Sequence, residues 1–237
     1  MIDAVLIDID NTIIDFVTTK RNAIKRAIKE MQLRGLKISK EEAEKKIMEV
    51  YSESRHGMED KKVFQKFLKK LGYVEKNQEY FRILYSGVNG YRQERSKGWI
   101  VYEGVYETLK NIKESGLKLG VVTDALNEKA YLRLTNTQLD FYFDVIVTRS
   151  ISKEYKPSGR PFLIALNKLK VKPQNAIFVG DNPKRDIAGA KAVGLITVYA
   201  SYGTTDKGTI LFNHENIKAD HVINDIRELS DILENLK

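Results

Sequence analysis

The sequence Val5-Leu6-Ile7-Asp8-Ile9-Asp10-Asn11-Thr12 decides how the rest of the chain is interpreted. It begins as a short apolar run, which is typical of a buried strand in a parallel sheet, and it ends on two carboxylates and a hydroxyl. Residues just beyond such a strand face the crevice where open α/β sheets bind ligands. Two carboxylates this close disfavour joint ionisation unless a cation lies between them or one stays protonated. The stretch therefore predicts a divalent metal, or a nucleophile beside a proton donor.

Length and composition narrow the class of protein. The 237 residues suit one large α/β domain, or one core with a smaller inserted domain. Cysteine is absent, which excludes disulfides, thiol catalysis and cysteine-ligated zinc. No signal peptide and no bilayer-spanning run are visible, so we expect a cytoplasmic protein with no membrane partner.

The formal net charge of +8 raises the question of a nucleic-acid partner. Lysine and glutamate are interspersed along predicted helices, as in residues 40–46. This mixture is typical of a solvated helix face rather than of a binding stripe, so we expect no nucleic-acid partner.

Residues 15–97 show helical hydrophobic spacing throughout. The spacing predicts four helices, over about 18–33, 39–51, 61–71 and 80–91. Ser39 followed by Glu42 is a capping-box signature at the start of the second helix. Since no strand pattern interrupts them, we expect residues 15–97 to form an all-helical domain inserted into a core made of residues 1–14 and 98–237.

After Trp99 the pattern alternates between strands and helices. The expected strands are 117–123, 143–148, 176–179 and 196–199, and the expected helices are 105–114, 129–134, 160–169, 187–193 and 226–236. A further short apolar run covers 221–223. Together with the first strand, this alternation predicts an α/β fold with a doubly wound parallel sheet.

Polar side chains follow four of the predicted strands. The carboxyl ends of parallel strands share one edge of the sheet, so these residues can converge although they are far apart in sequence. Carboxylates suit a hard cation, a lysine suits a phosphate, and a hydroxyl can donate a hydrogen bond. The residues are Asp8, Asp10 and Thr12 after the first strand, Thr123 after the second, Lys156 after the third, and Asp181, Asn182 and Asp186 after the fourth.

These residues together resemble the four motifs of the haloacid dehalogenase (HAD) superfamily. The matching elements are Asp8-x-Asp10-x-Thr12, Thr123 at a strand end, Lys156-Pro157 and Gly180-Asp181-x-x-x-x-Asp186, in the same order and with matching spacing. The helical insertion is similar to the C1 cap of the family. Within the family, the chain resembles the phosphatases of the phosphoglycolate phosphatase type. The resemblance covers essentially the whole chain and implies a Rossmann-like core.

The resemblance also implies a role for each motif residue. Asp8 would attack phosphorus and form an aspartyl-phosphate, and Asp10 would act as general acid and then as general base. Mg²⁺ would be held by Asp8, the backbone carbonyl of Asp10, and Asp181. The phosphate would be bound by Thr123, the backbone N–H of Asp124 and Lys156. Around these groups would lie Thr12, Asn182 and Asp186, which would orient them.

One position departs from the family pattern. The second-motif Thr is often followed by Asn and Gly, whereas this chain has Asp124-Ala125. The backbone donor is kept, but an additional acid beside a phosphate is unexpected. We expect its carboxylate to point away from the phosphate pocket.

Each residue taken alone also has an ordinary structural interpretation. Asp8 or Asp10 could cap a helix, and Asp186 could pair with Arg185 or Lys184 on the surface. Arg55-His56 could reach substrate from a loop of the insertion, although a solvated loop is the simpler interpretation. His56, His214 and His221 lack metal-ligand spacing and are expected to be structural or surface residues.

Three functions remain to be compared. The first is a Mg²⁺-dependent phosphatase acting on a small phosphate ester such as a sugar, polyol or phosphoglycolate-like phosphate, closed off by the cap. The second is a 2-haloacid dehalogenase, and the third is a non-catalytic binding protein on the same fold. Asp10 favours the phosphatase, because a halide leaving group needs no proton. The intact motif set disfavours a binding protein.

Overall fold

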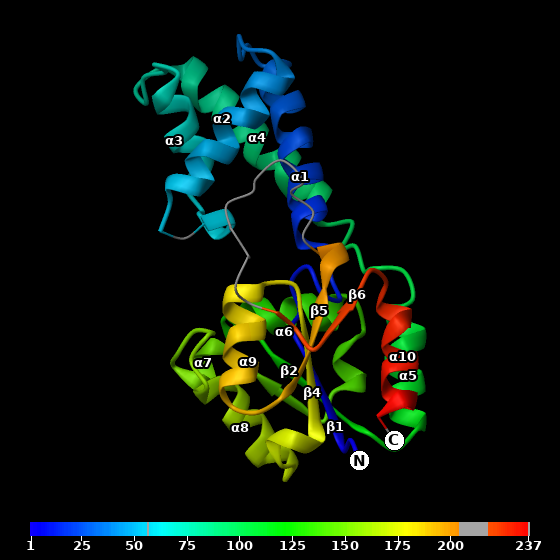
Figure 1. The fold of residues 1–237 in the computed structure, drawn as a ribbon. Helices are drawn as coiled ribbons and strands as arrows, with labels where there is room; N and C mark the ends of the chain where they lie inside the picture. Colours follow the sequence, from blue (N-terminus) through cyan, green and yellow to red (C-terminus); the bar gives the residue numbers. More distant parts are fainter. Residues whose placement is uncertain (56, 204–217, 237) are drawn as a thin grey trace. The chain divides into compact units, whose positions relative to one another are not determined.

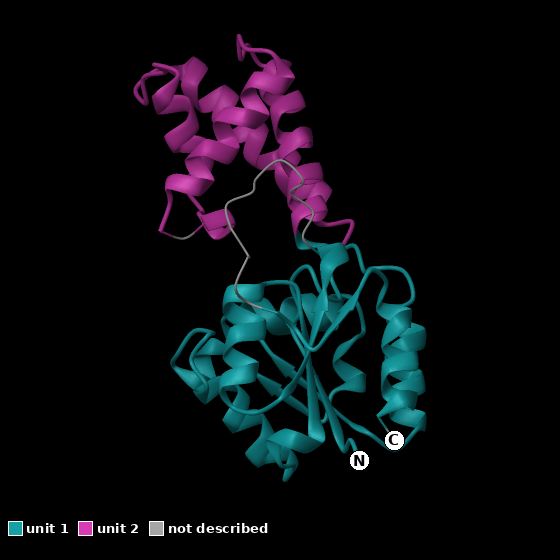
Figure 2. Ribbon diagram, in the orientation of Figure 1, with its two compact units in different colours: residues 1–16, 99–237 teal, residues 17–98 magenta. Residues whose placement is uncertain are grey.

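The structure is a computed structural model that describes residues 1–55, 57–203 and 218–236 (Figure 1). It contains two compact units: residues 1–16 and 99–237 form unit 1, and residues 17–98 form unit 2 (Figure 2). His56 and His214, for which the sequence predicts a structural or surface role, lie outside the described residues. Within the described part of the chain, none of the helices is both long and apolar enough to span a bilayer.

Unit 1 is built on a parallel sheet of six strands. Their order is β3-β2-β1-β4-β5-β6, with the first strand in the middle of the sheet and crossovers on both sides of it. The predicted doubly wound α/β fold is therefore confirmed. The sixth strand is the short apolar run near the C-terminus. The strands are β1 (Ala4–Ile7), β2 (Lys118–Val122), β3 (Val145–Val147), β4 (Ala176–Gly180), β5 (Ile196–Ala200) and β6 (His221–Ile223).

Helices cover both faces of this sheet (Figure 1). Successive side chains of a strand point to opposite faces, so Ile7 and Leu6 belong to different cores. Ile7 packs in the core that includes residues of α5 (Val105–Glu114), α6 (Asn127–Asn136) and α10 (Leu229–Asn235). Leu6 packs in the core that includes residues of α8 (Arg160–Leu169) and α9 (Ala188–Ala192). Because both faces are covered, the strands read as continuous apolar runs.

Several short turns fall outside the elements expected from the sequence. They lack the length needed to show a hydrophobic period. The segment directly after β4 is a single π-helical turn, η4 (Pro183–Ile187), rather than the start of a regular helix. The others are α7 (Arg149–Ser152), η1 (Gly57–Glu59), η2 (Asp140–Tyr142), η3 (Pro173–Asn175) and η5 (Ser201–Gly203). The turn η6 (Ile226–Glu228) lies within the expected helix over 226–236 and precedes α10.

The helices of unit 2 enclose an apolar core of their own. The Ser39 hydroxyl accepts the N–H of Glu42 at 3.1 Å, as the capping-box pattern predicts. Gly87 allows α4 to approach α1 closely, since a Cβ there would lie 2.0 Å from Cε of Met31. The helices are α1 (Phe16–Gln32), α2 (Lys40–Glu53), α3 (Val63–Lys70) and α4 (Gln78–Arg95).

The two chain segments that join the units are paired with each other within unit 1. The N–H of Asp15 donates to the carbonyl of Ile100 at 2.8 Å, and Ile14 and Val101 form an antiparallel bridge. The rings of Phe16 and Trp99 stack with centroids 5.8 Å apart. These contacts keep the chain with unit 1 as far as Phe16 and again from Trp99, whereas the sequence pattern predicts the changes after residues 14 and 97.

Candidate active site

Asp8 follows β1 directly and is buried, with a fractional exposure of 5%. Its N–H donates to the carbonyl of Val179 in β4, which continues the strand pairing by one residue beyond β1. One of its carboxylate oxygens, Oδ1, lies 2.8 Å from Nζ of Lys156. The strand thus delivers a carboxylate into the interior, where a lysine from a distant loop meets it.

Lys156 is itself buried and lies among oxygen atoms. Its Nζ is 2.7 Å from Oδ1 of Asp186 and donates to the carbonyl of Val122, at the end of β2, at 3.1 Å. Burial alone would lower the pKa of Lys156, but the negative charges of Asp186 and Asp8 outweigh it and hold the pKa above its usual value. Lys156 is therefore a fixed cation at the carboxyl edge of the sheet.

The Asp8 carboxyl is poorly solvated. Burial raises its pKa to about 7, the nearby charges of Asp186 and Asp10 add to this rise, and the ammonium of Lys156 opposes it. Burial also raises the pKa of Asp181 well above its usual value, and the charges of Asp186 and Asp8 act in the same direction. The charges of Arg185 and Lys156 oppose the rise for Asp181 without cancelling it, so a bound cation would stabilise the ionised form of the cluster.

Asp181 and Asp186 follow β4, and their carboxylate oxygens and one of Asp8 all lie within 4.8 Å of one another. The π-helical turn η4 bends the chain back so that Oδ2 of Asp186 accepts the N–H of Asn182 at 2.9 Å. Gly180 makes room for this return, because a Cβ there would lie 2.6 Å from Cβ of Asp186. The side chain of Asn182 accepts the N–H of Arg185 and thus fixes the turn itself.

The donor set fits a hard divalent cation, since such ions prefer clustered carboxylate oxygens. Within the cluster, Asp186 already has both oxygens engaged, one with Lys156 and the other with the N–H of Asn182. Asp8 and Asp181 are therefore the carboxylates best placed to hold a metal ion, and Asp186 is best placed to orient the lysine.

Asp10 and Thr12 lie in the loop after β1. The side chain of Asp10 is 28% exposed, and its Oδ1 lies 3.2 Å from Nε of Arg133. Arg133 belongs to α6 and is not among the residues predicted from the sequence. Thr12 is fully buried, and its hydroxyl has no hydrogen-bond partner among the described residues. The carbonyl of Thr12 accepts a hydrogen bond from the hydroxyl of Tyr202 at 2.8 Å.

Thr123 is the residue that follows β2, and it is buried. Its N–H donates to the carbonyl of Val147 in β3, and its hydroxyl oxygen accepts the N–H of Ala125 at 3.2 Å. Ile7 is paired with Val121 in the sheet register, so Thr123 leaves the sheet beside the chain that carries Asp8. This places a hydroxyl at the same edge as the carboxylate cluster.

The unexpected acid, Asp124, contacts two other loops and so braces them. Its Oδ1 accepts the N–H of Lys156 at 2.9 Å, and its Oδ2 lies 3.3 Å from Nη1 of Arg185. Both oxygens are thus directed at the segments that follow β3 and β4. This geometry explains how an acid can follow Thr123: it supports the lysine-bearing loop through the backbone.

Tyr202 and Gly203, which follow β5, are further residues that sequence reasoning missed. A Cβ on Gly203 would lie 1.8 Å from the carbonyl oxygen of Asn11 and 2.8 Å from Cβ of Asp181, so only glycine fits against the loop that carries Asp10. The Tyr202 hydroxyl reaches the same loop at Thr12. No local pattern signals these contacts, because the partners are separated by about 190 residues.

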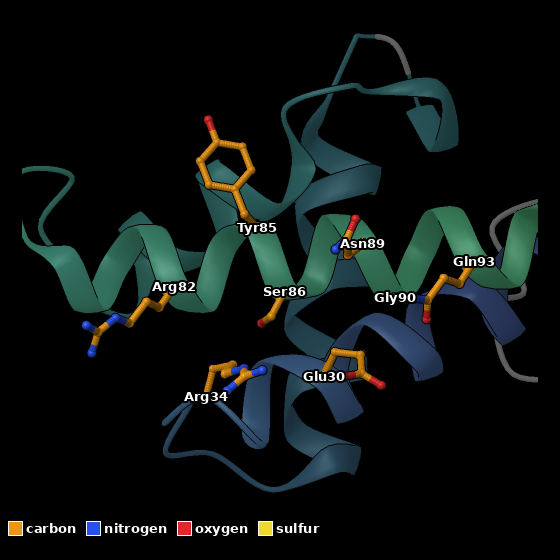
Figure 3. A pocket seen from close by; sticks show the side chains of 8 residues that line it. All are labelled: Glu30, Arg34, Arg82, Tyr85, Ser86, Asn89, Gly90 and Gln93. Carbon is orange, nitrogen blue, oxygen red and sulfur yellow. The ribbon is translucent and has the colours of Figure 1, made fainter.

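A separate hollow of about 500 Å³ lies in unit 2, between α1 and α4 (Figure 3). Its lining is mostly polar and includes the side chains of two arginines. It contains none of the residues that follow the strands of the sheet, so it is distinct from the carboxylate cluster. The lining residues are Glu30, Arg34, Arg82, Tyr85, Ser86, Asn89, Gly90 and Gln93.

Comparison with known proteins identifies the family. Residues 5–200 match the family described as haloacid dehalogenase-like hydrolase. The chain belongs to this family. The resemblance drawn from the four motifs is therefore confirmed, and the chain is an enzyme of the hydrolase class.

Relatives of this HAD hydrolase align over most or all of its length. The glyceraldehyde 3-phosphate phosphatase of Methanocaldococcus jannaschii is 30% identical over 238 residues, which cover 100% of this chain and 99% of that protein. The protein of the same name from Methanopyrus kandleri is 31% identical over 201 residues, covering 84% and 83%. A solved HAD phosphatase from Thermococcus onnurineus is 29% identical with a TM-score of 0.65, covering 98% of both chains.

Proposed function

We propose that this HAD hydrolase is a phosphatase that cleaves small phosphate monoesters through an aspartyl-phosphate on Asp8. The observation that carries the proposal is the ion pair between Asp8 and Lys156 at 2.8 Å, inside a buried cluster with two further carboxylates. Phosphoryl transfer needs a positioned nucleophile and neutralisation of the phosphate charge more than it needs any other chemistry. The ion pair supplies a carboxylate nucleophile and a fixed cation side by side.

The other residues of the edge complete the proposed reaction. Asp10 gives a proton to the leaving oxygen and afterwards takes one from the water that cleaves the aspartyl-phosphate. The hydroxyl of Thr123, the N–H of Asp124 and the ammonium of Lys156 bind phosphate oxygens. Asp186 keeps the lysine in place, and Asn182 and Thr12 maintain the two loops.

We propose Mg²⁺ as the cofactor, held by Asp8, Asp181 and the backbone carbonyl of Asp10. When bound, the ion would neutralise charge on the phosphoryl group and on the carboxylates that surround it. The support for this assignment is the donor set itself, because burial of several carboxylates close together disfavours their joint ionisation.

The names of two relatives suggest the substrate class. Both of the curated relatives described above are named glyceraldehyde 3-phosphate phosphatases, and one of them aligns over the whole chain. We therefore propose a short phosphorylated aldehyde, polyol or acid as the substrate, with unit 2 acting as the cap domain that selects it. Glyceraldehyde 3-phosphate, glycerol phosphate and phosphoglycolate are the first compounds to compare.

The direct test is release of inorganic phosphate from these compounds and from p-nitrophenyl phosphate. We expect turnover with added Mg²⁺ and none after treatment with EDTA, with recovery when Mg²⁺ is restored. Asp8→Asn should lose at least about 10³-fold in activity. Asp231→Asn, which changes an exposed acid on α10, should leave it unchanged. Equal activity of the two variants would reject Asp8 as the nucleophile.

The alternative activity within this family is cleavage of a carbon–halogen bond in a short haloacid. Asp10 argues against it, since halide leaves as an anion without a proton. Incubation with 2-chloropropionate tests this directly, and we expect no chloride release. Chloride release together with failure to hydrolyse any phosphate ester would replace the phosphatase proposal by dehalogenation.

A further inference from the structure

Arg133 is a large charged side chain that is almost completely removed from solvent. It lies on α6 with a fractional exposure of 2%, and its Nε is 3.2 Å from Oδ1 of Asp10. Burying a guanidinium is costly unless a carboxylate and other favourable contacts compensate for the lost hydration. None of the four motifs contains this residue. Its placement against Asp10 therefore requires its own explanation.

Aromatic rings hold the guanidinium from a second side. Its Cζ lies 4.9 Å from the ring centroid of Phe16 and 5.0 Å from that of Trp99, within the range of cation–π attraction. The two rings stack on each other with an interplanar angle of 16°. Asn136, one turn further along α6, accepts the N–H of Trp99 at 3.2 Å. Residues of α6 thus contact both chain segments that join the units, one at Phe16 and the other at Trp99.

The carboxylate of Asp10 is more exposed than that of Asp8. It stands in a loop and is 28% exposed, whereas the side chain of Asp8 is 7% exposed and paired with Lys156. A partly exposed carboxylate in a loop samples several rotamers unless something fixes one of its oxygens. The ion pair with Arg133 favours the rotamers of Asp10 that keep Oδ1 beside the guanidinium.

We propose that Arg133 is a positioning residue for Asp10, fixed in turn by Phe16 and Trp99. The inference rests on the proposed function. As the bond between phosphorus and the leaving oxygen breaks, its electron pair stays on that oxygen, and the proton held by Asp10 moves to it. The same carboxylate then removes a proton from the water whose oxygen attacks phosphorus, which frees Asp8 and releases inorganic phosphate. Arg133 holds Asp10 in the orientation that both transfers need.

The dependence on leaving group distinguishes positioning from mere structural support. The p-nitrophenolate leaving group is stable as an anion and needs little help from an acid, whereas the alkoxide of glycerol phosphate needs a proton. The parameter kcat/KM reports the steps up to transfer of phosphate to Asp8, so it does not include the later hydrolysis. A residue that acts through Asp10 must therefore change the ratio of kcat/KM for the two substrates.

The experiment measures kcat/KM of Arg133→Met and Arg133→Lys with both substrates. For Arg133→Met we expect a loss of about 10²-fold with glycerol phosphate and less than about fivefold with p-nitrophenyl phosphate. Arg133→Lys keeps the charge, so its ratio of kcat/KM for the two substrates should lie between those of the wild type and of Arg133→Met. The matched control is Arg160→Met, which removes an exposed arginine of α8 that pairs with Glu154, and it should leave the ratio unchanged.

A double-mutant cycle adds a second readout. In an Asp10→Asn background, Arg133→Met should produce no further change in the ratio, because the group that it positions is already inactive. An equal loss with both substrates, or a further change in the Asp10→Asn background, would overturn the proposal and leave Arg133 as a structural residue. If circular dichroism shows that Arg133→Met is unfolded, the ratio is taken from Arg133→Lys, and an unchanged ratio there overturns it equally. If the wild-type protein hydrolyses neither substrate, the proposed function fails rather than this inference.

Discussion

Lys156 places its ammonium 2.8 Å from the carboxylate of Asp8 although 148 positions separate the two residues in the sequence, and both side chains are buried. Lys156 also lies 2.7 Å from Asp186, so one cation serves two carboxylates. This relationship joins the ends of three strands into one site. Lys156 is thus the cation in direct contact with two of the three clustered carboxylates.

Replacement of Lys156 by Met should abolish activity while keeping most of the side-chain volume. We expect phosphate release to fall at least about 10²-fold, because the phosphate loses its fixed cation. In EDTA the free energy of unfolding should fall by about 3 kcal/mol, since two buried carboxylates lose their partner. Lys168→Met on the exposed side of α8 is the control for both measurements. A variant of Lys156 with normal turnover would contradict the proposed phosphate-binding role.

Asp124 should matter through its hydrogen bond rather than through its charge. Asp124→Asn keeps an acceptor for the N–H of Lys156. It loses the pair with Arg185 and a charge that acts on Lys156 less than those of Asp186 and Asp8, so we expect a change in kcat of less than about threefold. Asp124→Ala loses the hydrogen bond as well and should lower kcat about tenfold, because the lysine-bearing loop is less well positioned.

Arg185→Gln removes the other member of the ion pair. Because the charge of Arg185 also acts on Asp186, Asp8 and Asp181, we expect kcat to fall at least as far as in Asp124→Asn. Steady-state kinetics of the three variants decide the question. If Asp124→Asn were as damaging as Asp124→Ala, the negative charge itself would be required, and the bracing interpretation would be wrong.

The larger elements of the fold could be predicted because hydrophobic periodicity reports which face of an element is buried. The helices at Val105–Glu114 and Arg160–Leu169 have the predicted bounds. The strand His221–Ile223 appeared only as an apolar run, because three residues carry too little pattern to distinguish a strand. The π-helical turn after β4 depends on the return of Asp186 over Gly180, which is a tertiary contact.

The candidate site likewise has residues that the sequence predicts and residues that it does not. The convergence of Asp8, Lys156, Asp181 and Asp186 was predictable because parallel strand ends share one edge. Arg133 was not, because its neighbours on α6 show only that the helix is amphipathic and cannot show that a charged residue is turned inward. For Asp124 the sequence indicated a departure from the family pattern and an orientation away from the pocket. Its partners became visible only in the structure.

Gly203 should tolerate no side chain. Gly203→Ala would place a Cβ 1.8 Å from the carbonyl oxygen of Asn11, so the loop after β1 must move. Because that loop carries Asp10, we expect activity to fall about tenfold or more, together with a lower melting temperature.

Gly116→Ala separates backbone strain from this clash. Gly116 has a φ of +81° but open space around it, so the substitution should cost about 1 kcal/mol of stability and leave activity unchanged. Thermal unfolding and kcat of both variants are the measurements. Full activity of Gly203→Ala would show that the loop adapts without disturbing Asp10.

Asp60 should make the stability of unit 2 depend on pH. Its buried carboxylate accepts hydrogen bonds from Lys66, Ser54 and the N–H of Lys62, and the hydrogen bond from Lys66 above all holds the pKa of Asp60 well below its usual range. A group whose pKa is lower in the folded state stabilises the protein above its unfolded pKa, and this contribution is lost as the pH falls towards the folded pKa.

Asp60→Asn should therefore lower the free energy of unfolding by about 1–3 kcal/mol at pH 7, since an amide cannot accept from both the ammonium and the hydroxyl at one side. The difference from the wild type should stay constant down to about pH 4 and then shrink, because protonation removes the same interactions from the wild type. Urea unfolding followed by circular dichroism across this range is the measurement. Glu49→Gln, at an exposed position of α2, should show no such trend. A difference that is already lost between pH 7 and pH 5 would mean that another group is responsible for the effect.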